Sequence, residues 1–157
     1  SDRSDPTLVR DEVSALLLKA RRVLNNLYVL KRELYRARGS GLIDMLTIGP
    51  ISKLQKHRHL DQVKVAISKA RKSLESYEYA VAAIRPEWHI DSHIPLAIIT
   101  LDRFEGNFFF AWAIQRKIRK LQQQTAKLVT IFEGEVAGLE NREMEVDSEM
   151  DKFKGED

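Results

Sequence analysis

Four histidines and four nearby aspartates are the residues whose types could bind a metal ion. They are His57, His59, His89 and His93, with Asp44, Asp61, Asp91 and Asp102. Imidazole and carboxylate groups are common ligands of Zn²⁺ and related ions. The two histidine pairs flank a stretch patterned as a helix, so at ~1.5 Å per residue they lie tens of Å apart. Lys56 and Arg58 repel a cation from the first pair, and the prolines flanking the second pair oppose helical alignment of its ligands. Surface or loop-capping histidines are therefore favoured, and we expect no metal site.

The first of these segments also offers a small polar site of Asp44, Lys56 and His57. Catalysis there would need a nucleophile and its base at a recognisable spacing, or a glycine-rich phosphate loop, and the sequence holds neither pattern. We therefore expect no enzyme activity and no cofactor. Structural roles are favoured instead: Asp44 caps a short helix, Gly49 permits a turn that a Cβ would obstruct, and Asp61 favours the positive N-terminus of the next helix.

The distribution of charge raises a second kind of chemistry, the binding of anions. The chain carries 26 Lys and Arg against 23 Asp and Glu, but 23 of those cations precede Glu133 and ten of the acids lie at or beyond it. A basic body is therefore followed by an acidic tail. In one interpretation these charges simply keep a helical surface hydrated, and the tail either attracts the body or repels itself. In the other, the body binds an anionic partner, and the tail competes with that partner for the same basic patch.

An anion-binding module, for nucleic acid or an anionic membrane surface, is one of two functions that the sequence allows. Its candidate cations are Arg21, Arg22, Lys31, Arg32, Arg36, Arg116, Lys117, Arg119 and Lys120. The last four surround Ile118 on most sides of a helix, and we expect no aromatic residues interleaved with cations on an exposed face. The sequence therefore favours the other function, a structural or protein–protein interaction module that acts through helix packing or oligomerisation.

Apolar residues at alternating spacings of four and three dominate three long stretches, which predicts helices wound side by side. The expected elements are helices at about 6–38, 60–84 and 103–154, a short helical element at 42–57 and an extended connector at 85–102. Together they form one all-α domain over residues 1–157, an antiparallel three-helix coiled-coil bundle with a short insertion and an over-long third helix. A slip in apolar register predicts a bend or break at 56–59.

Local signals set the predicted helix ends. Asp5 and Pro6 form an N-cap and first-turn pair, and Gly39 provides a C-terminal stop. Asp102 with Glu105 three residues later resembles a capping box, which predicts that the third helix begins near Arg103.

The predicted third helix outruns its neighbours. Before Phe132 a second apolar stripe widens the buried face, as a helix that touches two others requires, and beyond Phe132 one narrow stripe remains. Gly134 and Gly138 each cost about 1 kcal/mol relative to Ala inside a helix. We therefore expect residues 134–157 to be an acidic, projecting tail that either finds a partner, another protein or a second copy of the chain, or frays in isolation.

Two segments carry a family resemblance. The first contains Asp44, Met45, Leu46, Gly49, Ile51, Ser52, Leu54, Lys56, His57, His59, Leu60 and Asp61; the second contains Phe104, Phe108, Trp112, Ile114, Gln115, Lys117 and Ile118. They resemble segments of an uncharacterised family of small helical bacterial proteins. The resemblance implies a helical fold but no activity. Thr47 and Ile48 stand where that family has glycines, and Ala111 replaces an Asp before Trp112.

Two residues of the second segment have structural explanations of their own. Trp112 lies between two apolar stripes, so it is favoured as a core residue rather than a ligand-stacking one. Gln115 occupies a stripe position, where a buried hydrogen bond can fix helix register.

The sequence also bears on the compartment. It has no cysteine, which excludes disulfides and thiolate chemistry and favours a reducing, cytoplasmic location. Its longest apolar runs fall far below the roughly 20 residues of a transmembrane helix.

Overall fold

The computed structural model of the chain describes residues 5–39, 50–84, 93–106 and 114–155, with side chains described for 5–37, 61–84, 94–106 and 118–155. The described residues form four α-helices and no strand. The helices are α1 (Pro6–Gly39), α2 (Pro50–Ile84), α3 (His93–Gly106) and α4 (Ile114–Gly155). The predicted all-α class is thus confirmed, but the three-helix count is wrong, because the described residues hold a fourth helix, α3.

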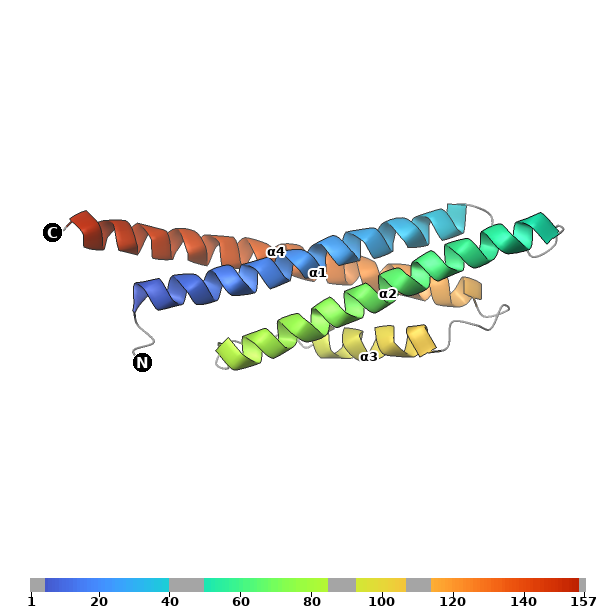
Figure 1. The fold of residues 1–157 in the computed structure, drawn as a ribbon, viewed down its shortest axis with the longest axis horizontal. Coiled ribbons are helices and arrows are strands. Elements are labelled where there is room, and N and C mark those ends of the chain that lie inside the picture. Colours follow the sequence, from blue (N-terminus) through green and yellow to red (C-terminus); the bar gives the residue numbers. More distant parts are fainter. Residues whose placement is uncertain (1–4, 40–49, 85–92, 107–113, 156–157) are drawn as a thin grey trace.

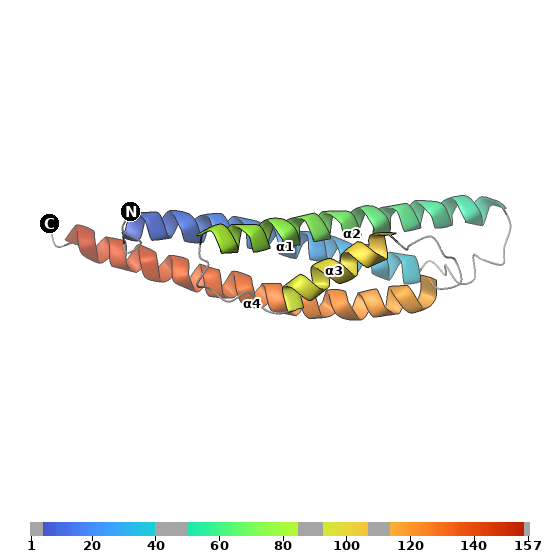
Figure 2. The ribbon, with the colours of Figure 1, turned by 90° about the horizontal axis from the view of Figure 1, so that it is seen from below.

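Successive helices run in opposite directions along one elongated body (Figure 1). Helix α1 packs against both α2 and α4, and the short α3 packs against α2 and, more lightly, against α4. Seen from below, α3 lies between α2 and α4 over the middle of the body (Figure 2). The end of α1 and the starts of α2 and α4 therefore share one end of the molecule.

The N-terminus of α1 is capped as the sequence predicts. The backbone N–H of Thr7 donates to Oδ1 of Asp5 at 3.0 Å, and the N–H of Val9 donates to the carbonyl of Asp5 at 3.0 Å. Pro6 occupies the first helical position, where its missing N–H costs no intrahelical bond. The Asp5–Pro6 prediction is confirmed.

The apolar stripe of α1 forms the centre of the core. Its fully or almost fully buried members are Val13, Leu16, Ala20, Val23, Leu27, Leu30, Leu34 and Ala37. Burial of a Leu or Val side chain stabilises the folded state by about 1.5–3 kcal/mol relative to exposure. Because the stripe extends along the whole helix, α1 can contact α2 on one side and α4 on the other.

Helix α2 is continuous, and two predictions about its start are wrong. It begins at Pro50, a residue favoured at the first position of a helix, rather than near Leu60. The helix is unbroken through 56–59, so the expected break there is absent. Asp61 consequently lies inside the helix, where its exposed side chain cannot interact with the helix N-terminus. From Val63 on, the predicted stripe is buried through Val81.

Helix α3 replaces most of the extended connector predicted at 85–102. Ile94, Leu101 and Phe104 are buried at helical spacing, so a helix here has an apolar face to pack. Pro95 lies in the first turn, where proline is tolerated. The β-branched residues lower helix propensity by only tenths of a kcal/mol each, which tertiary burial outweighs.

The predicted capping box at Asp102 and Glu105 is also wrong. Both residues lie near the C-terminal end of α3, and both face Arg71 of α2. Nε of Arg71 lies 2.8 Å from Oε2 of Glu105 and 3.8 Å from Oδ1 of Asp102. The next helix, α4, begins at Ile114, so the two acids connect α3 to α2 instead of starting the last helix.

The predicted change of stripe width along α4 is confirmed for the described side chains. Leu121 and Leu128 widen the buried face before Phe132, and beyond Phe132 only the narrow stripe of Val136, Leu139 and Val146 is buried. The narrow stripe packs on the N-terminal half of α1. The expectation of a tail projecting from residue 134 is therefore wrong up to about Val146.

Polar contacts fix the antiparallel register of this outer section. They join Arg10 to Asp147, Ser14 to Glu143, Arg21 to Glu140 and Tyr28 to Glu133, at 3.3, 3.2, 3.2 and 2.8 Å. Residue numbers rise along α1 as they fall along α4. The acidic half of α4 thus partly neutralises the positive charge of α1 in the same molecule. Part of the charge asymmetry between the basic body and the acidic tail is therefore balanced within the chain.

Candidate functional site

A groove between the C-terminal half of α1 and the N-terminal half of α4 is the candidate site. Its volume is about 350 Å³. The lining residues are Tyr28, Lys31, Arg32 and Tyr35 from α1, with Gln122 and Thr125 from α4. We call it the tyrosine groove.

Helical spacing places the α1 residues on one face. Positions 28, 31, 32 and 35 are related by steps of three, four and seven, which stack side chains along a helix. Leu27, Leu30 and Leu34 of the neighbouring stripe are fully buried and anchor α1 in the core. The two tyrosines are consequently held at the surface: Tyr28 is 43% exposed and Tyr35 is 73% exposed.

Tyr28 is fixed by a contact across the groove. Its hydroxyl donates a hydrogen bond to Oε1 of Glu133 on α4 at 2.8 Å. This hydrogen bond, with a smaller contribution from burial, raises the pKa of Tyr28 above its ordinary value of 10.0. The phenol is therefore neutral at physiological pH, and the carboxylate that accepts from it is directed toward the tyrosine.

The groove is electrostatically positive. Lys31 and Arg32 line it, and Arg36 lies one turn beyond Arg32. Glu33, which is nearly buried, is shared by two of these cations: its Oε1 lies 3.7 Å from Arg32 Nε and 3.5 Å from Arg36 Nη1. Two carboxylates, Glu33 and the Glu133 that accepts from Tyr28, thus offset part of three positive charges. No acid among the described side chains forms an ion pair with Lys31.

The α4 wall of the groove is anchored in the core by Thr125. Its hydroxyl donates to the backbone carbonyl of Leu121 at 2.7 Å, and the side chain is fully buried. Since that hydroxyl already has an acceptor, Thr125 contributes a rigid wall rather than a reactive group.

Taken together, the groove residues provide apolar ring surface beside positive charge. Tyrosine presents an apolar ring with a polar end, and it is enriched at protein interfaces. Lysine and arginine bind carboxylates and phosphates, arginine often in a bidentate manner. Among the described lining residues there is neither an activated nucleophile nor a carboxylate pair. The described lining can contact an anion that has an apolar part.

A second, smaller groove lies between α3 and α4, with a volume of about 180 Å³. Its described lining is mainly apolar, with Leu96, Leu101, Leu128 and Ile131 among its residues, and Lys127 is the charged residue in that described lining. It lacks the clustered charge and aromatic rings of the tyrosine groove. Nothing in it defines a ligand class.

Most of the site residues predicted from the sequence lie outside the described side chains. Asp44, Gly49 and Trp112 are outside the described residues altogether. Lys56 and His57 lie in α2 and Gln115 in α4, but only their backbones are described. Both helix starts are at the same end of the body (Figure 1). The roles assigned to these residues remain predictions.

The histidines considered for metal binding are likewise not described at the side-chain level. His57 and His59 belong to α2 and His93 to α3, and His89 is outside the described residues. Within the part of the chain that the structure describes, no group of three His, Cys, Asp or Glu residues is arranged to bind a metal ion.

The tyrosine groove was missed by sequence reasoning, which expected no aromatic residue interleaved with cations on an exposed face. That expectation is wrong for α1. Tyr28 and Tyr35 lie one heptad apart with Lys31 and Arg32 between them, and the spacing could have identified the face.

Comparison of the chain with models of protein families, with curated proteins and with solved structures finds no match in any of the three. Among the described helices, none combines the length and apolar character needed to cross a bilayer.

Proposed function

We propose that this protein is a non-catalytic protein–protein interaction module that binds an acidic segment of a partner in the tyrosine groove. One observation carries the proposal: Tyr28 and Tyr35 are exposed on the same face of α1, and Lys31 and Arg32 lie between them. The rings offer apolar contact area, and the cations select carboxylates. An acidic helix or extended segment with an aromatic or aliphatic anchor has the complementary chemistry.

The charge of the surrounding end supports this choice of ligand. The last turns of α1 carry Arg36 and Arg38, and the first turns of α4 carry Arg116, Lys117, Arg119 and Lys120. These turns share one end of the body (Figure 1). Because clustered charge of one sign raises the local concentration of the opposite sign, it favours the approach of an acidic partner.

The acidic half of the same chain leaves the tyrosine groove accessible. Glu140 and Asp147 contact Arg21 and Arg10, which lie N-terminal to the groove along α1. Glu140 thus occupies Arg21, one of the candidate cations of the basic body, but no described contact joins the acidic half of α4 to Lys31 or Arg32. Glu133 reaches the groove, but its carboxylate accepts the hydrogen bond of Tyr28.

An anion-binding module for nucleic acid or an anionic membrane is the second candidate. The basic end favours it, since phosphates attract the same cations. The two exposed tyrosines disfavour duplex DNA more strongly than a lipid surface as the ligand. Duplex DNA presents its phosphates to a protein and offers no free base on which Tyr28 or Tyr35 could stack. A single short groove with two rings fits a peptide better than a long polyanion. The proposed setting is the cytoplasm, in keeping with the absence of cysteine.

Fluorescence anisotropy with matched probes tests the proposal. The probes are a short labelled peptide rich in Glu with one Phe, the same peptide with Gln for each Glu, a labelled duplex DNA, a labelled single-stranded DNA and vesicles containing phosphatidylserine. We expect saturable binding of the acidic peptide, at least about tenfold weaker binding of the Gln peptide, and loss of affinity as salt rises.

The same panel distinguishes the alternatives. If both DNA probes or the vesicles bind more tightly than the acidic peptide at equal salt, the anion-binding function replaces the interaction module. If no probe binds at low ionic strength, where attraction between opposite charges is strongest, both functions are wrong.

A further inference from the structure

We infer that the acidic segment bound by the tyrosine groove is the C-terminal end of α4 from a second copy of this chain, so that copies associate head to tail. This inference deepens the proposed function and rests on it. The basic groove and the acidic end are two complementary surfaces carried by one molecule.

The acidic end presents an exposed face with an apolar anchor. Glu145, Glu149 and Phe153 follow one another at intervals of four residues, so they lie on one side of α4. Phe153 is 70% exposed, and both glutamates are exposed. An exposed aromatic side chain beside carboxylates is the combination of groups that we propose the tyrosine groove binds.

The dimensions of the two surfaces are similar. At ~1.5 Å per residue, Tyr28 and Tyr35 are separated by roughly 10 Å along α1, and Glu145 and Phe153 by roughly 12 Å along α4. Lys31 and Arg32 lie between the tyrosines, as Glu149 lies between Glu145 and Phe153. The cations on α1 of one copy and the carboxylates on α4 of the other can therefore lie opposite each other along a contact of similar length.

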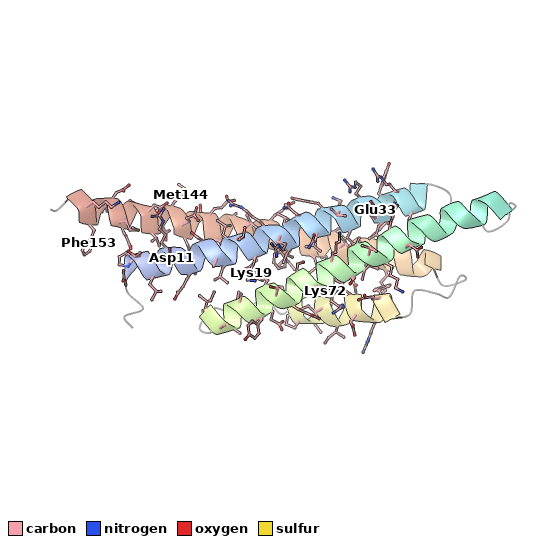
Figure 3. The ribbon with its side chains drawn as sticks, viewed as in Figure 1. Asp11, Lys19, Glu33, Lys72, Met144 and Phe153 are labelled. Atoms are coloured by element: carbon pink, nitrogen blue, oxygen red, sulfur yellow. The ribbon has the colours of Figure 1, made fainter. Side chains whose placement is uncertain are left out.

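The acidic end cannot reach the groove of its own molecule. Gln122 and Thr125 line the groove near the start of α4, and Glu149 belongs to the same continuous helix. That separation is roughly 35–40 Å at ~1.5 Å per residue. In Figure 3, Phe153 and Met144 lie toward one end of the body, and Glu33, which neighbours Arg32 of the groove, lies far from them. The occupant must come from a different molecule.

Among the described contacts, residues 140–147 of α4 meet α1. Val146 is the last buried residue of the stripe, and from Asp151 on every described residue is exposed. Lys152 and Lys154 lie among these residues and reduce the negative charge of the last turn, so Glu145 and Glu149 supply the attraction. A head-to-tail contact uses two different patches of the chain, so it leaves one of each unoccupied and continues to further copies.

Charge reversal in two places provides the test. The groove variant carries Lys31→Glu and Arg32→Glu, and the tail variant carries Glu145→Lys and Glu149→Lys. Sedimentation velocity of the wild-type chain should show a concentration-dependent increase in mass at about 0.02 M salt and its loss at about 0.5 M salt, because screening shortens the range of the attraction. Each variant alone should remain a monomer at low salt, with unchanged helical circular dichroism.

Mixing the two variants is the decisive step. The reversed groove then meets a reversed tail, and the wild-type groove meets a wild-type tail, so the mixture should associate as the wild-type chain does. Association that survives in either variant alone, that is absent from the mixture, or that is insensitive to salt overturns the inference. A wild-type chain that stays monomeric but binds the acidic peptide also overturns it, while the proposed function stands. If the peptide is not bound either, the proposed function fails as well.

Discussion

The hydroxyl of Tyr28 on α1 donates a 2.8 Å hydrogen bond to Glu133 on α4, directly beside the cations of the tyrosine groove. This bond directs the Glu133 carboxylate toward the phenol. Glu133 is negatively charged with or without this bond, but the bond holds the carboxylate at the phenol, and its loss leaves that charge without this partner at the groove.

Tyr28→Phe should weaken binding of the acidic peptide about three- to tenfold, because the released carboxylate competes with the ligand for the groove cations. Anisotropy titration measures the change. Tyr79→Phe is the matched control, since Tyr79 is exposed on α2 and away from the groove. Equal affinities of the Tyr28→Phe and Tyr79→Phe variants would contradict the prediction.

Tyr77 joins α2 to α4 through two contacts. Its hydroxyl donates to Oε2 of Glu135 at 2.7 Å, and its ring meets that of Phe132 edge to face, with centroids 5.2 Å apart and an interplanar angle of 71°. Burial, reinforced by the hydrogen bond to Glu135, raises the pKa of Tyr77 well above its usual range. The neutral, hydrogen-bonded phenol is thus part of the core.

Tyr77→Phe should lower the free energy of unfolding by about 1 kcal/mol, the usual net value of a hydrogen bond, and Tyr77→Ala by about 3–5 kcal/mol, because a cavity is added. Urea denaturation followed by circular dichroism measures both. A Tyr77→Phe variant as stable as wild type would show that the contact with Glu135 contributes nothing.

Arg71 connects α2 to α3. It lies 2.8 Å from Glu105 and 3.8 Å from Asp102, and it also donates to Glu75 within α2 at 3.0 Å. Arg71→Met should destabilise the docking of α3 by about 1–2 kcal/mol, after allowance for solvent screening. Hydrogen exchange of the α3 amides should accelerate. Arg103→Met, an exposed change on α3, should leave those amides unaffected; equal acceleration in both variants would contradict this role.

The same contact predicts a dependence on acid pH. Burial acts to raise the pKa of Glu105, but the hydrogen bond and charge of Arg71 outweigh it and hold that pKa below the ordinary value of 4.5. A depressed pKa in the folded state stabilises the fold above pH 4.5, and that stabilisation is lost as the pH falls through the lower, folded-state value. Exchange of the α3 amides should therefore rise in this acid range in the wild-type chain, but not in the Arg71→Met variant.

Gly134 and Gly138 weaken α4 without a packing reason. A Cβ added at either position meets nothing within 4 Å. Gly134→Ala and Gly138→Ala should each raise the free energy of unfolding by about 0.5–1 kcal/mol, because alanine restricts the unfolded chain and favours the helix. Thermal denaturation measures the gain. A loss of stability in either variant would mean that this face of α4 is covered.

The long apolar repeats were sufficient to predict α1, most of α2 and the width of the buried face of α4, since period and burial are directly linked in a helix. They could not predict α3. Its Pro95 and β-branched run favour an extended chain locally, and the burial of Ile94, Leu101 and Phe104 that reverses this preference depends on α2 and α4. The slip in apolar register at 56–59 likewise predicted a break that α2 does not have, because the helix continues through these residues.

The candidate site could be predicted only in part. The cations Lys31 and Arg32 were identified from the sequence, but their neighbours Gln122 and Thr125 come from a helix far along the chain. Their proximity depends on the antiparallel register of α1 and α4, which side-chain contacts such as that of Arg21 with Glu140 fix. No local pattern contains that register. The acidic tail illustrates the same limit, since its narrow stripe indicated one partner helix but not that α1 supplies it.

Charge reversal in the tyrosine groove tests the central claim most directly. The Lys31→Glu and Arg32→Glu double variant is compared with a control, Arg22→Glu and Lys69→Glu, which makes the same change in net charge at exposed positions outside the groove. In anisotropy titrations with the acidic peptide, the groove variant should lose at least about tenfold in affinity and the control less than about threefold. Equal losses in the two variants would show that net charge alone attracts the peptide, and would contradict binding in the groove.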